Sequence, residues 1–199
     1  MLAAGASRRL GRPKQLLMHG GEPLIRRAVN AAIESRLGRG YVVLATGDDA
    51  SRAAIEGLSV EIVPNPDADR GIGASIKAAM AALPGDTNEA VLMVVDQPAV
   101  TSALLTDLAA ALRPDSLAAA CEYGGTIGVP AIYRRALFDE LMRLKDDAGA
   151  KSILLRHRGC VATIPFAAGQ ADIDTPSDAA RLRPPGGSSV GFENPLNDV

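Results

Sequence analysis

The feature that most limits the fold of this chain is an alternation between short apolar runs and longer amphipathic stretches. Residues 41–45 and 90–95 are uncharged and rich in β-branched side chains, a pattern that predicts strands buried on both faces. Weaker strand candidates lie at 60–63, 117–121, 129–133 and 161–164. Strands covered on both faces belong to mostly parallel sheets, which pack between two layers of helices.

Helical periodicity fills the segments between these strands. Within 24–37 the apolar residues recur every three or four positions and form one stripe along a helix. Further helices are predicted at 50–57, 74–83, 102–112, 135–144, 149–156 and 177–183, with Asp48 or Asp49, Ser75, Thr101 and Ser177 as N-caps. The pattern predicts an α/β fold, namely a doubly wound, mostly parallel sheet with helices on both faces. Aromatic residues make up only 3% of the chain, which argues against an aromatic-rich β-sandwich.

Length and composition predict one folded domain followed by a tail. The chain has 199 residues, which is the size of a single domain. Residues 184–199 are rich in Pro, Gly, Ser and Asn, so we expect a disordered tail there and a folded domain at 1–183.

The first predicted strand is unusually short. Only Met1–Ala3 precede the loop that contains Gly5, whereas a full strand needs roughly 5 residues. Either the start codon is assigned too late, or the protein begins with a stub. A truncated central strand leaves backbone groups of its neighbours without partners. A chain extended by several upstream codons is therefore expected to be more stable and to bind nucleotide more tightly.

Charge and hydropathy exclude several functional classes. The net charge of −2 does not suit a nucleic-acid surface, and no apolar run reaches the ~18 residues of a membrane span. The N-terminus places small residues before charged ones, unlike a signal peptide, so a cytoplasmic protein is expected. Cys121 and Cys160 are expected to be two buried thiols in a reducing compartment. His19 and His157 fit no motif and are expected on the surface.

The first candidate site is the segment L-A-A-G-A-S-R-R-L-G-R-P-K-Q-L-L at 2–17. Gly5 and Gly11 bracket a loop after a strand, where small residues let backbone N–H groups approach phosphate oxygens. Arg9 and Lys14 could neutralise a triphosphate. The glycine spacing fits neither the Walker loop nor G-x-G-x-x-G. Taken by itself, this spacing is equally that of a basic surface turn opening a helix.

Carboxylates at two other places suggest a metal site. Asp96 follows the strand 90–95, where a hard oxygen ligand would face the ligand crevice of the sheet. Asp172 and Asp174 alternate along a short predicted strand and so share one side of it. Simpler interpretations are a helix cap for Asp96 and a capped turn for the second pair. The glycine-rich turn 70–76 opens a helix whose N-terminus could face an anion, or it is an ordinary loop.

Together these segments resemble the MobA-like nucleotidyltransferase family, most closely its molybdenum cofactor cytidylyltransferase branch. The resemblance spans residues 2–183 and includes the L-A-A-G loop, D-x-P at Asp96 and D-I-D-T-P-x-D at the C-terminal end. It implies that the nucleotide is contacted by Leu2, Ala3, Ala4, Gly5, Arg9, Lys14, Gly71 and Ser75, and that Mg²⁺ is held by Asp96 and Asp174. Ala4 implies a preference for CTP, because guanine-using relatives tend to have Gly at that place.

One departure from the family concerns the acceptor. The cytidylyltransferases read G-H-P where this chain has Gly128-Val129-Pro130, and Val cannot donate a hydrogen bond as His can. Residues 146–151 resemble the family's G-D-x-G-A-[RK] element, but they also suit a solvated turn.

The resemblance implies Mg²⁺-dependent transfer of a nucleotidyl group from an NTP to a phosphorylated small molecule, with pyrophosphate released and no covalent intermediate. The favoured acceptor is a molybdopterin-type cofactor, which brings in a molybdoenzyme or its chaperone as partner. One alternative is another phosphorylated acceptor such as a sugar phosphate. The other is a non-catalytic nucleotide- or cofactor-binding accessory protein, against which the retained Arg9, Lys14 and Asp96 argue.

Overall fold

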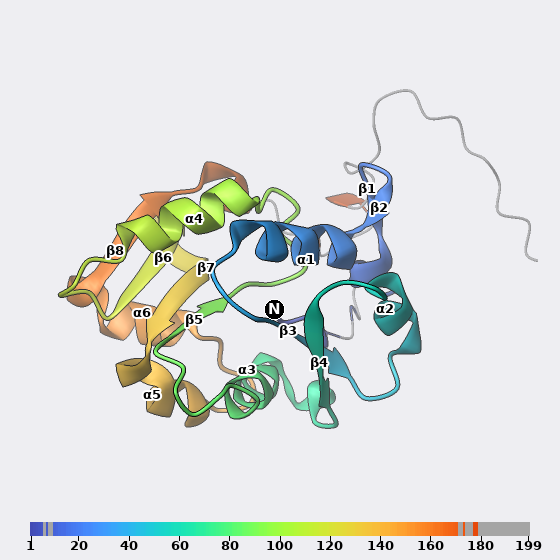
Figure 1. The fold of residues 1–199 in the computed structure, drawn as a ribbon, viewed down its shortest axis with the longest axis horizontal. Helices are drawn as coiled ribbons and strands as arrows, with labels where there is room; N and C mark the ends of the chain where they lie inside the picture. Colours follow the sequence, from blue (N-terminus) through green and yellow to red (C-terminus); the bar gives the residue numbers. More distant parts are fainter. Residues whose placement is uncertain (6, 8–9, 171–172, 174–176, 179–199) are drawn as a thin grey trace, which may run out of the picture.

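The computed structural model describes residues 1–5, 7, 10–170, 173 and 177–178, and it shows one sheet with helices on both sides (Figure 1). On one side β3 (Gly40–Ala45) pairs in parallel with β4 (Val60–Asn65). On the other side the order is β5 (Glu89–Leu92), β7 (Thr126–Arg134), β6 (Ala118–Tyr123) and β8 (Val161–Pro165). The strands predicted at 41–45, 60–63, 90–95, 117–121, 129–133 and 161–164 are all present, and the predicted fold class is confirmed. The short strand predicted around Asp172 and Asp174 lies outside the described residues.

The two halves of the sheet are joined by the first residues of the chain. Leu2 forms parallel bridges both to Val43 in β3 and to Val94, just beyond β5. Its N–H donates to the Met93 carbonyl at 2.9 Å, and the Ala3 N–H donates to the Val43 carbonyl at 3.0 Å. Met1–Ala3 therefore form the central, buried strand of the sheet, although this strand is unusually short.

The sheet departs from parallel pairing at β7, which runs antiparallel to both β5 and β6. The cause is the turn between β6 and β7, where Gly124 and Gly125 both have positive φ. Two consecutive residues of this kind form a tight hairpin, which reverses the chain direction between neighbouring strands. A similar Gly20-Gly21 turn joins the short antiparallel strands β1 (Met18–His19) and β2 (Glu22–Pro23). The Gly-Gly pairs carried this signal in the sequence, and the expectation of a mostly parallel sheet overlooked it.

The helices form two layers. The upper layer in Figure 1 contains α1 (Leu24–Ser35) and α4 (Ser102–Ala111). The lower layer contains α3 (Ile72–Ala81), α5 (Phe138–Met142) and α6 (Lys151–Arg156). The remaining helix is α2 (Asp49–Ala54), and short 3₁₀ helices lie at η1 (Lys14–Leu16), η2 (Ala68–Arg70), η3 (Arg135–Leu137), η4 (Arg158–Cys160) and η5 (Ala167–Gln170). The predicted helices up to residue 156 are all found, and most are shorter than predicted, whereas α3 keeps the predicted length and begins two residues earlier.

The N-cap predictions have mixed outcomes. Asp48 and Thr101 accept hydrogen bonds from the third residue beyond them, as N-caps do. Ser75 is not a cap, because α3 begins at Ile72 and places Ser75 inside the helix. Residues 177–178 are helical, whereas the cap assignment of Ser177, the rest of the last predicted helix and the tail at 184–199 lie outside the described residues.

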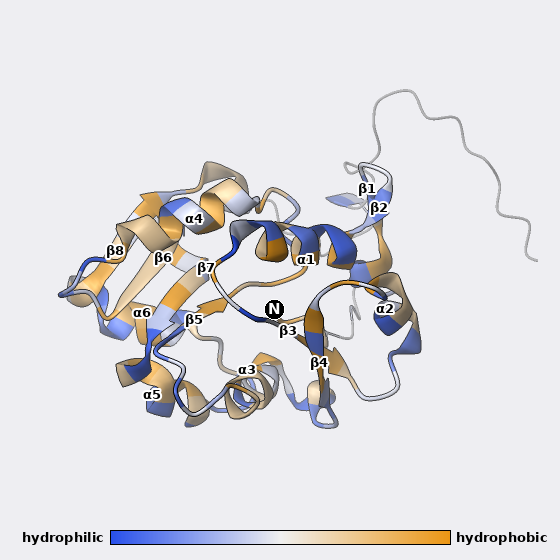
Figure 2. Cartoon of the chain, in the orientation of Figure 1, coloured by the Kyte–Doolittle hydropathy of each residue, from blue (hydrophilic) through white to orange (hydrophobic). Residues whose placement is uncertain are grey.

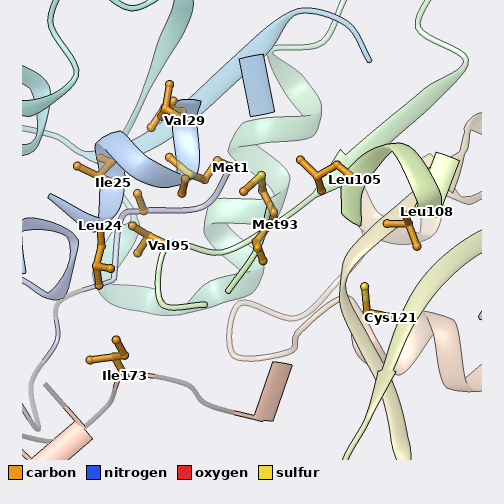
Figure 3. Packing of buried hydrophobic residues seen from close by; sticks show 14 of the residues in the cluster. Met1, Leu24, Ile25, Val29, Met93, Val95, Leu105, Leu108, Cys121 and Ile173 are labelled. Carbon is orange, nitrogen blue, oxygen red and sulfur yellow. The ribbon is translucent and has the colours of Figure 1, made fainter. Parts of the chain in front are cut away.

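Each helix layer covers its own core. The division between polar and apolar sides is clearest in α1, whose polar residues face outward while Leu24, Ile25 and Val29 are buried (Figure 2). Met1, Met93 and Val95 pack beneath α1 and α4 (Figure 3), and Leu2, Val43 and Leu92 pack beneath the opposite layer. Successive strand residues point to opposite faces, so one central strand serves both cores.

One expectation about a single residue needs correction. Cys121 is buried as predicted, but Cys160 is exposed. His19 and His157 are partly exposed, which agrees with the expected surface positions, and His157 also lies 2.7 Å from a Glu140 carboxylate oxygen. No helix in the described part of the chain is both long and apolar enough to cross a membrane.

A cavity of about 720 Å³ lies beside Met1, between the first residues of β3 and β5. The Met1 α-amino group is buried there and donates a hydrogen bond to the Tyr41 carbonyl at 2.6 Å. Burial disfavours the charged form and lowers the pKa of this amino group from 8.0 to about 5.

This buried amine predicts a pH-dependent stability. Between about pH 5 and pH 8 the unfolded chain binds a proton that the folded chain does not, so the free energy of unfolding rises with pH across that window. The full difference is on the order of 4 kcal/mol. Urea unfolding of the chain beginning at Met1 measures it. N-terminal acetylation is the control, since it removes the titrating group and should abolish this part of the pH dependence. An unchanged pH profile after acetylation would contradict the prediction.

Candidate active site

A cavity of about 330 Å³ opens at the carboxyl ends of the central strands. Three segments line it: the loop after Met1–Ala3, the approach to α3, and the residues that follow β5. Their lining residues are Leu2, Ala4, Gly5, Ser7, Lys14, Ala68, Asp69, Gly71, Ile72, Ser75, Val94, Val95 and Asp96. Ligands of open α/β sheets bind at this edge, where the strand order reverses beside the first strand.

The loop after the first strand is held by side chains of η1. The Gln15 amide donates to the Ala3 carbonyl at 3.0 Å and to the Gly5 carbonyl at 3.4 Å. The Ser7 hydroxyl accepts a hydrogen bond from the Lys14 backbone N–H at 3.0 Å. A Cβ atom at Gly5 would meet no protein atom within 4 Å, so the loop borders open space on the cavity side.

The charged centre of the cavity is the pair formed by Lys14 and Asp96. The Lys14 ammonium group contacts the Asp96 carboxylate, and both side chains are only 16% exposed. The Asp96 carbonyl also accepts a hydrogen bond from the Ile173 N–H at 3.2 Å. The loop, the end of the central strand and the C-terminal segment therefore meet at Asp96.

The start of α3 forms the second wall. Asn65, at the end of β4, donates a side-chain hydrogen bond to the Ser75 hydroxyl at 3.0 Å and accepts one from the Asp67 N–H at 3.0 Å. Asn65 and Ser75 are both buried. This pair explains why Ser75 is not a helix cap: its hydroxyl joins α3 to the end of the neighbouring strand.

The loop at 145–149 packs directly on the start of α3. The Gly73 N–H donates to the Asp146 carbonyl at 2.8 Å, and a Cβ atom on Gly73 would overlap the Lys145 carbonyl. The Asp146 carboxylate contacts Lys77 and lies 2.5 Å from an Arg70 guanidinium nitrogen. The hydrogen bond from Lys77, with support from Arg70, lowers the pKa of the Asp146 carboxyl. This segment is therefore not a free solvated turn.

Most of the predicted site residues lie together. Leu2, Ala4, Gly5, Lys14, Gly71, Ser75 and Asp96 all line the cavity. Ala3 is buried in the core and reaches the site only through its carbonyl group. Arg9, Asp172 and Asp174 lie outside the described residues, so their roles stay predictions. Val129 does not line the cavity, and its carbonyl accepts a hydrogen bond from the Tyr123 hydroxyl at 2.9 Å.

Several residues of this region were not predicted as site residues. The cavity is also lined by Ser7, Ala68, Asp69, Ile72, Val94 and Val95, and two glutamines, Gln15 and Gln97, are buried beside it. The only available signal for the glutamines was that each follows a charged site residue directly.

The donor set at Asp96 suits a divalent cation that is shared with substrate phosphates. The Asp96 carboxylate is a hard oxygen donor that already binds one cation, the Lys14 ammonium group, which a metal ion at this position would displace. No group of three or more His, Cys, Asp or Glu side chains that could enclose a metal occurs among the described residues. Mg²⁺ normally binds in this open way, through one or two carboxylates, with water and phosphate oxygens completing its shell.

A lysine on a glycine-containing loop, opposed by an aspartate at the carboxyl ends of parallel strands, lies where α/β proteins with an open sheet bind their ligands. A sequence profile described as "MobA-like NTP transferase domain" matches residues 1–161. The chain therefore belongs to the MobA-like NTP transferase family and is a nucleotidyltransferase of that type.

Individual relatives extend over almost the whole chain. Purine catabolism protein PucB of Bacillus subtilis (strain 168) is 28% identical over 197 residues, covering 92% of this chain and 93% of that protein. The crystal structure of Rv0371c from Mycobacterium tuberculosis H37Rv has a TM-score of 0.80 and 31% identity, covering 91% of this chain and 93% of that one. The structure of the same protein in complex with manganese has a TM-score of 0.76 and 29% identity, covering 91% and 94%.

The close approach at Gly73 predicts an unusual effect of alanine. In a helix interior, Gly→Ala normally stabilises by roughly 0.5–1 kcal/mol. Gly73→Ala should instead destabilise by about 1–3 kcal/mol, because its Cβ would overlap the Lys145 carbonyl in a packed contact. The free energy of unfolding in urea measures this effect.

The matched control is Gly85→Ala, where a Cβ atom meets nothing within 4 Å. That variant should stay within about 0.5 kcal/mol of the unsubstituted protein. Equal stability of the two variants would show that the 145–149 loop does not press on α3.

Proposed function

We propose that this protein is a Mg²⁺-dependent nucleotidyltransferase that joins an NTP, with CTP favoured, to a phosphorylated small molecule and releases pyrophosphate. The observation that carries the proposal is the Lys14–Asp96 pair at the centre of a cavity lined by Ala4, Gly5 and the start of α3. Family membership supports the reaction class, and the manganese complex of the related mycobacterial protein supports a divalent cation.

The proposed chemistry needs positioning and charge neutralisation rather than a covalent intermediate. The acceptor phosphate attacks the α-phosphorus of the NTP, and pyrophosphate leaves in line. Lys14, together with Arg9, stabilises the negative charge that develops on the leaving pyrophosphate. Backbone N–H groups near Gly5 add donors that need no reorganisation. Asp96 and Asp174 hold the Mg²⁺, which when bound supplies charge neutralisation at the phosphates.

The base preference rests on Ala4. This residue is 5% exposed and lines the cavity, so its methyl group occupies space that Gly would leave open. A smaller space favours a pyrimidine over a purine, in agreement with the Gly of guanine-using relatives.

The proposed acceptor is a molybdopterin-type cofactor, and a molybdoenzyme or its chaperone would then receive the product in the cytoplasm. A sugar phosphate is the second candidate acceptor, because Val129 stands where the cytidylyltransferases have a His. Incubating the protein and Mg²⁺ with each NTP and each acceptor class, and measuring pyrophosphate release, tests both candidates. Binding of NTP without release for any acceptor would instead point to a non-catalytic binding protein.

Replacement of the proposed metal ligand should abolish turnover. Asp96→Asn is nearly isosteric and should lower kcat at least tenfold, since a lost ligand costs more than ~1.4 kcal/mol of transition-state stabilisation. The matched control is Asp107→Asn, which replaces an exposed residue of α4 and should leave kcat unchanged. Thermal melts verify that both variants are folded. A folded Asp96→Asn protein that keeps more than about a tenth of the activity would exclude Asp96 as the essential ligand.

Nucleotide selectivity should appear in thermal stability. With Mg²⁺ present, CTP should raise the Tm more than GTP or ATP, because tighter ligands stabilise the folded state more. Ala4→Gly should narrow the difference between CTP and GTP by enlarging the cavity. Stronger stabilisation by GTP in the unsubstituted protein would refute the CTP preference.

A further inference from the structure

Two buried glutamines stand beside the charged residues of the cavity. Gln15 follows Lys14 and Gln97 follows Asp96, and each is only 4% exposed. A buried amide destabilises a fold unless it is hydrogen-bonded, so the partners of these side chains indicate what they hold in place.

The Gln15 side chain bonds to the phosphate-facing loop on both sides of Ala4. Its Nε2 donates to the Ala3 carbonyl at 3.0 Å and to the Gly5 carbonyl at 3.4 Å. Its Oε1 accepts a hydrogen bond from the Ser7 hydroxyl at 3.5 Å. One amide therefore contacts residues 3, 5 and 7 of this part of the chain.

The Gln97 side chain bonds to a different part of the molecule. Its Nε2 donates to the Tyr123 hydroxyl and to the Gly169 carbonyl, both at 3.3 Å. Gly169 lies in η5, and a few residues later the Ile173 N–H donates to the Asp96 carbonyl. The Ile173 side chain is buried in the same core cluster as Val95 (Figure 3). The C-terminal segment is thus fastened to residues 96 and 97 at two described points.

The Gln97 amide is also incompletely satisfied. Its Oε1 is buried and has no hydrogen-bond partner among the described residues. An unpaired buried carbonyl oxygen lowers stability, so an apolar side chain of the same length could be tolerated or even favoured at this position. Stability alone does not account for a glutamine here.

We infer that the two glutamines are positioning residues with separate tasks. Gln15 shapes the loop that receives the nucleotide, and Gln97 holds the C-terminal segment against Asp96 and so governs metal affinity. This inference rests on the proposed function for its binding readouts. The hydrogen bonds themselves predict local effects that can be measured without any ligand.

The test compares Gln15→Met, Gln97→Met and the control Gln170→Met, which replaces an exposed glutamine in η5. Binding of Mn²⁺ is followed by electron paramagnetic resonance at saturating non-hydrolysable NTP, and NTP binding is followed by calorimetry without metal. Gln97→Met should weaken Mn²⁺ binding about tenfold while metal-free NTP affinity stays within about twofold. Gln15→Met should show the opposite pattern, and Gln170→Met should change neither quantity.

Hydrogen exchange separates this inference from the proposed function. Without ligand, Gln97→Met should accelerate exchange of the Ile173 amide, and Gln15→Met should accelerate exchange of the amides near Gly5. The Tm of Gln97→Met should fall only modestly, because removal of the unsatisfied oxygen partly offsets the loss of the two hydrogen bonds that Nε2 donates. If Gln97→Met does not fold, Gln97→Asn, which keeps an amide on a shorter side chain, replaces it in every measurement.

The outcomes are distinguishable. If the unsubstituted protein binds neither NTP nor Mn²⁺ but the exchange changes are local as stated, the proposed function fails while the positioning roles stand. If both variants weaken metal and NTP binding equally, or if exchange changes spread over the whole chain, the separate tasks of Gln15 and Gln97 are wrong.

Discussion

The structure depends on three residues, Met1–Ala3, which pair with both β3 and the end of β5 and so join the two halves of the sheet. Because they sit at the centre, their side chains enter both cores, and the loop that follows them emerges between α1 and α3 at the carboxyl edge of the sheet. A loop that follows a buried central strand has its first residues fixed in position. Binding of a phosphate by backbone N–H groups requires such fixed donors. The same arrangement buries the α-amino group of Met1 and makes stability sensitive to pH.

At the other end of this strand, charge is concentrated at one point. Lys14 reaches Asp96 across the cavity, and Ile173 bonds to the backbone of the same aspartate. When a lysine and an aspartate of low exposure form an ion pair, the lysine can instead bind a phosphate while the aspartate binds a divalent cation. Neither side chain is then left as an unpaired buried charge. The Lys14–Asp96 ion pair thus leaves neither charge unpaired, and its two charges are the ones that a phosphate and a divalent cation would each require.

The sequence predicted the order of strands and helices well, because continuous apolar strands and amphipathic helices leave strong periodic signals. Asp96 was predicted from its place after a strand, whereas the family resemblance implied Lys14 and Gly71, and all three line the cavity. What the sequence missed depends on contacts between distant segments. The antiparallel direction of β7 arises from a two-glycine turn. The loop at residue 146 packs on α3, although the two are far apart in the sequence. The Ser75 hydroxyl accepts a hydrogen bond from Asn65 instead of capping its own helix. The hydrogen bonds of the two glutamines have no periodic signature at all.

The central claim is that a nucleotidyl group is transferred directly at the cavity that contains Lys14 and Asp96. The most direct measurement uses CTP labelled at the α-phosphorus, with Mg²⁺ and a phosphorylated acceptor, and follows where the label goes. We predict that the label appears on the acceptor at the same rate as pyrophosphate is released, and that no label stays attached to the protein. Label bound covalently to the protein, or CTP that remains intact in the presence of every acceptor class, would contradict the claim.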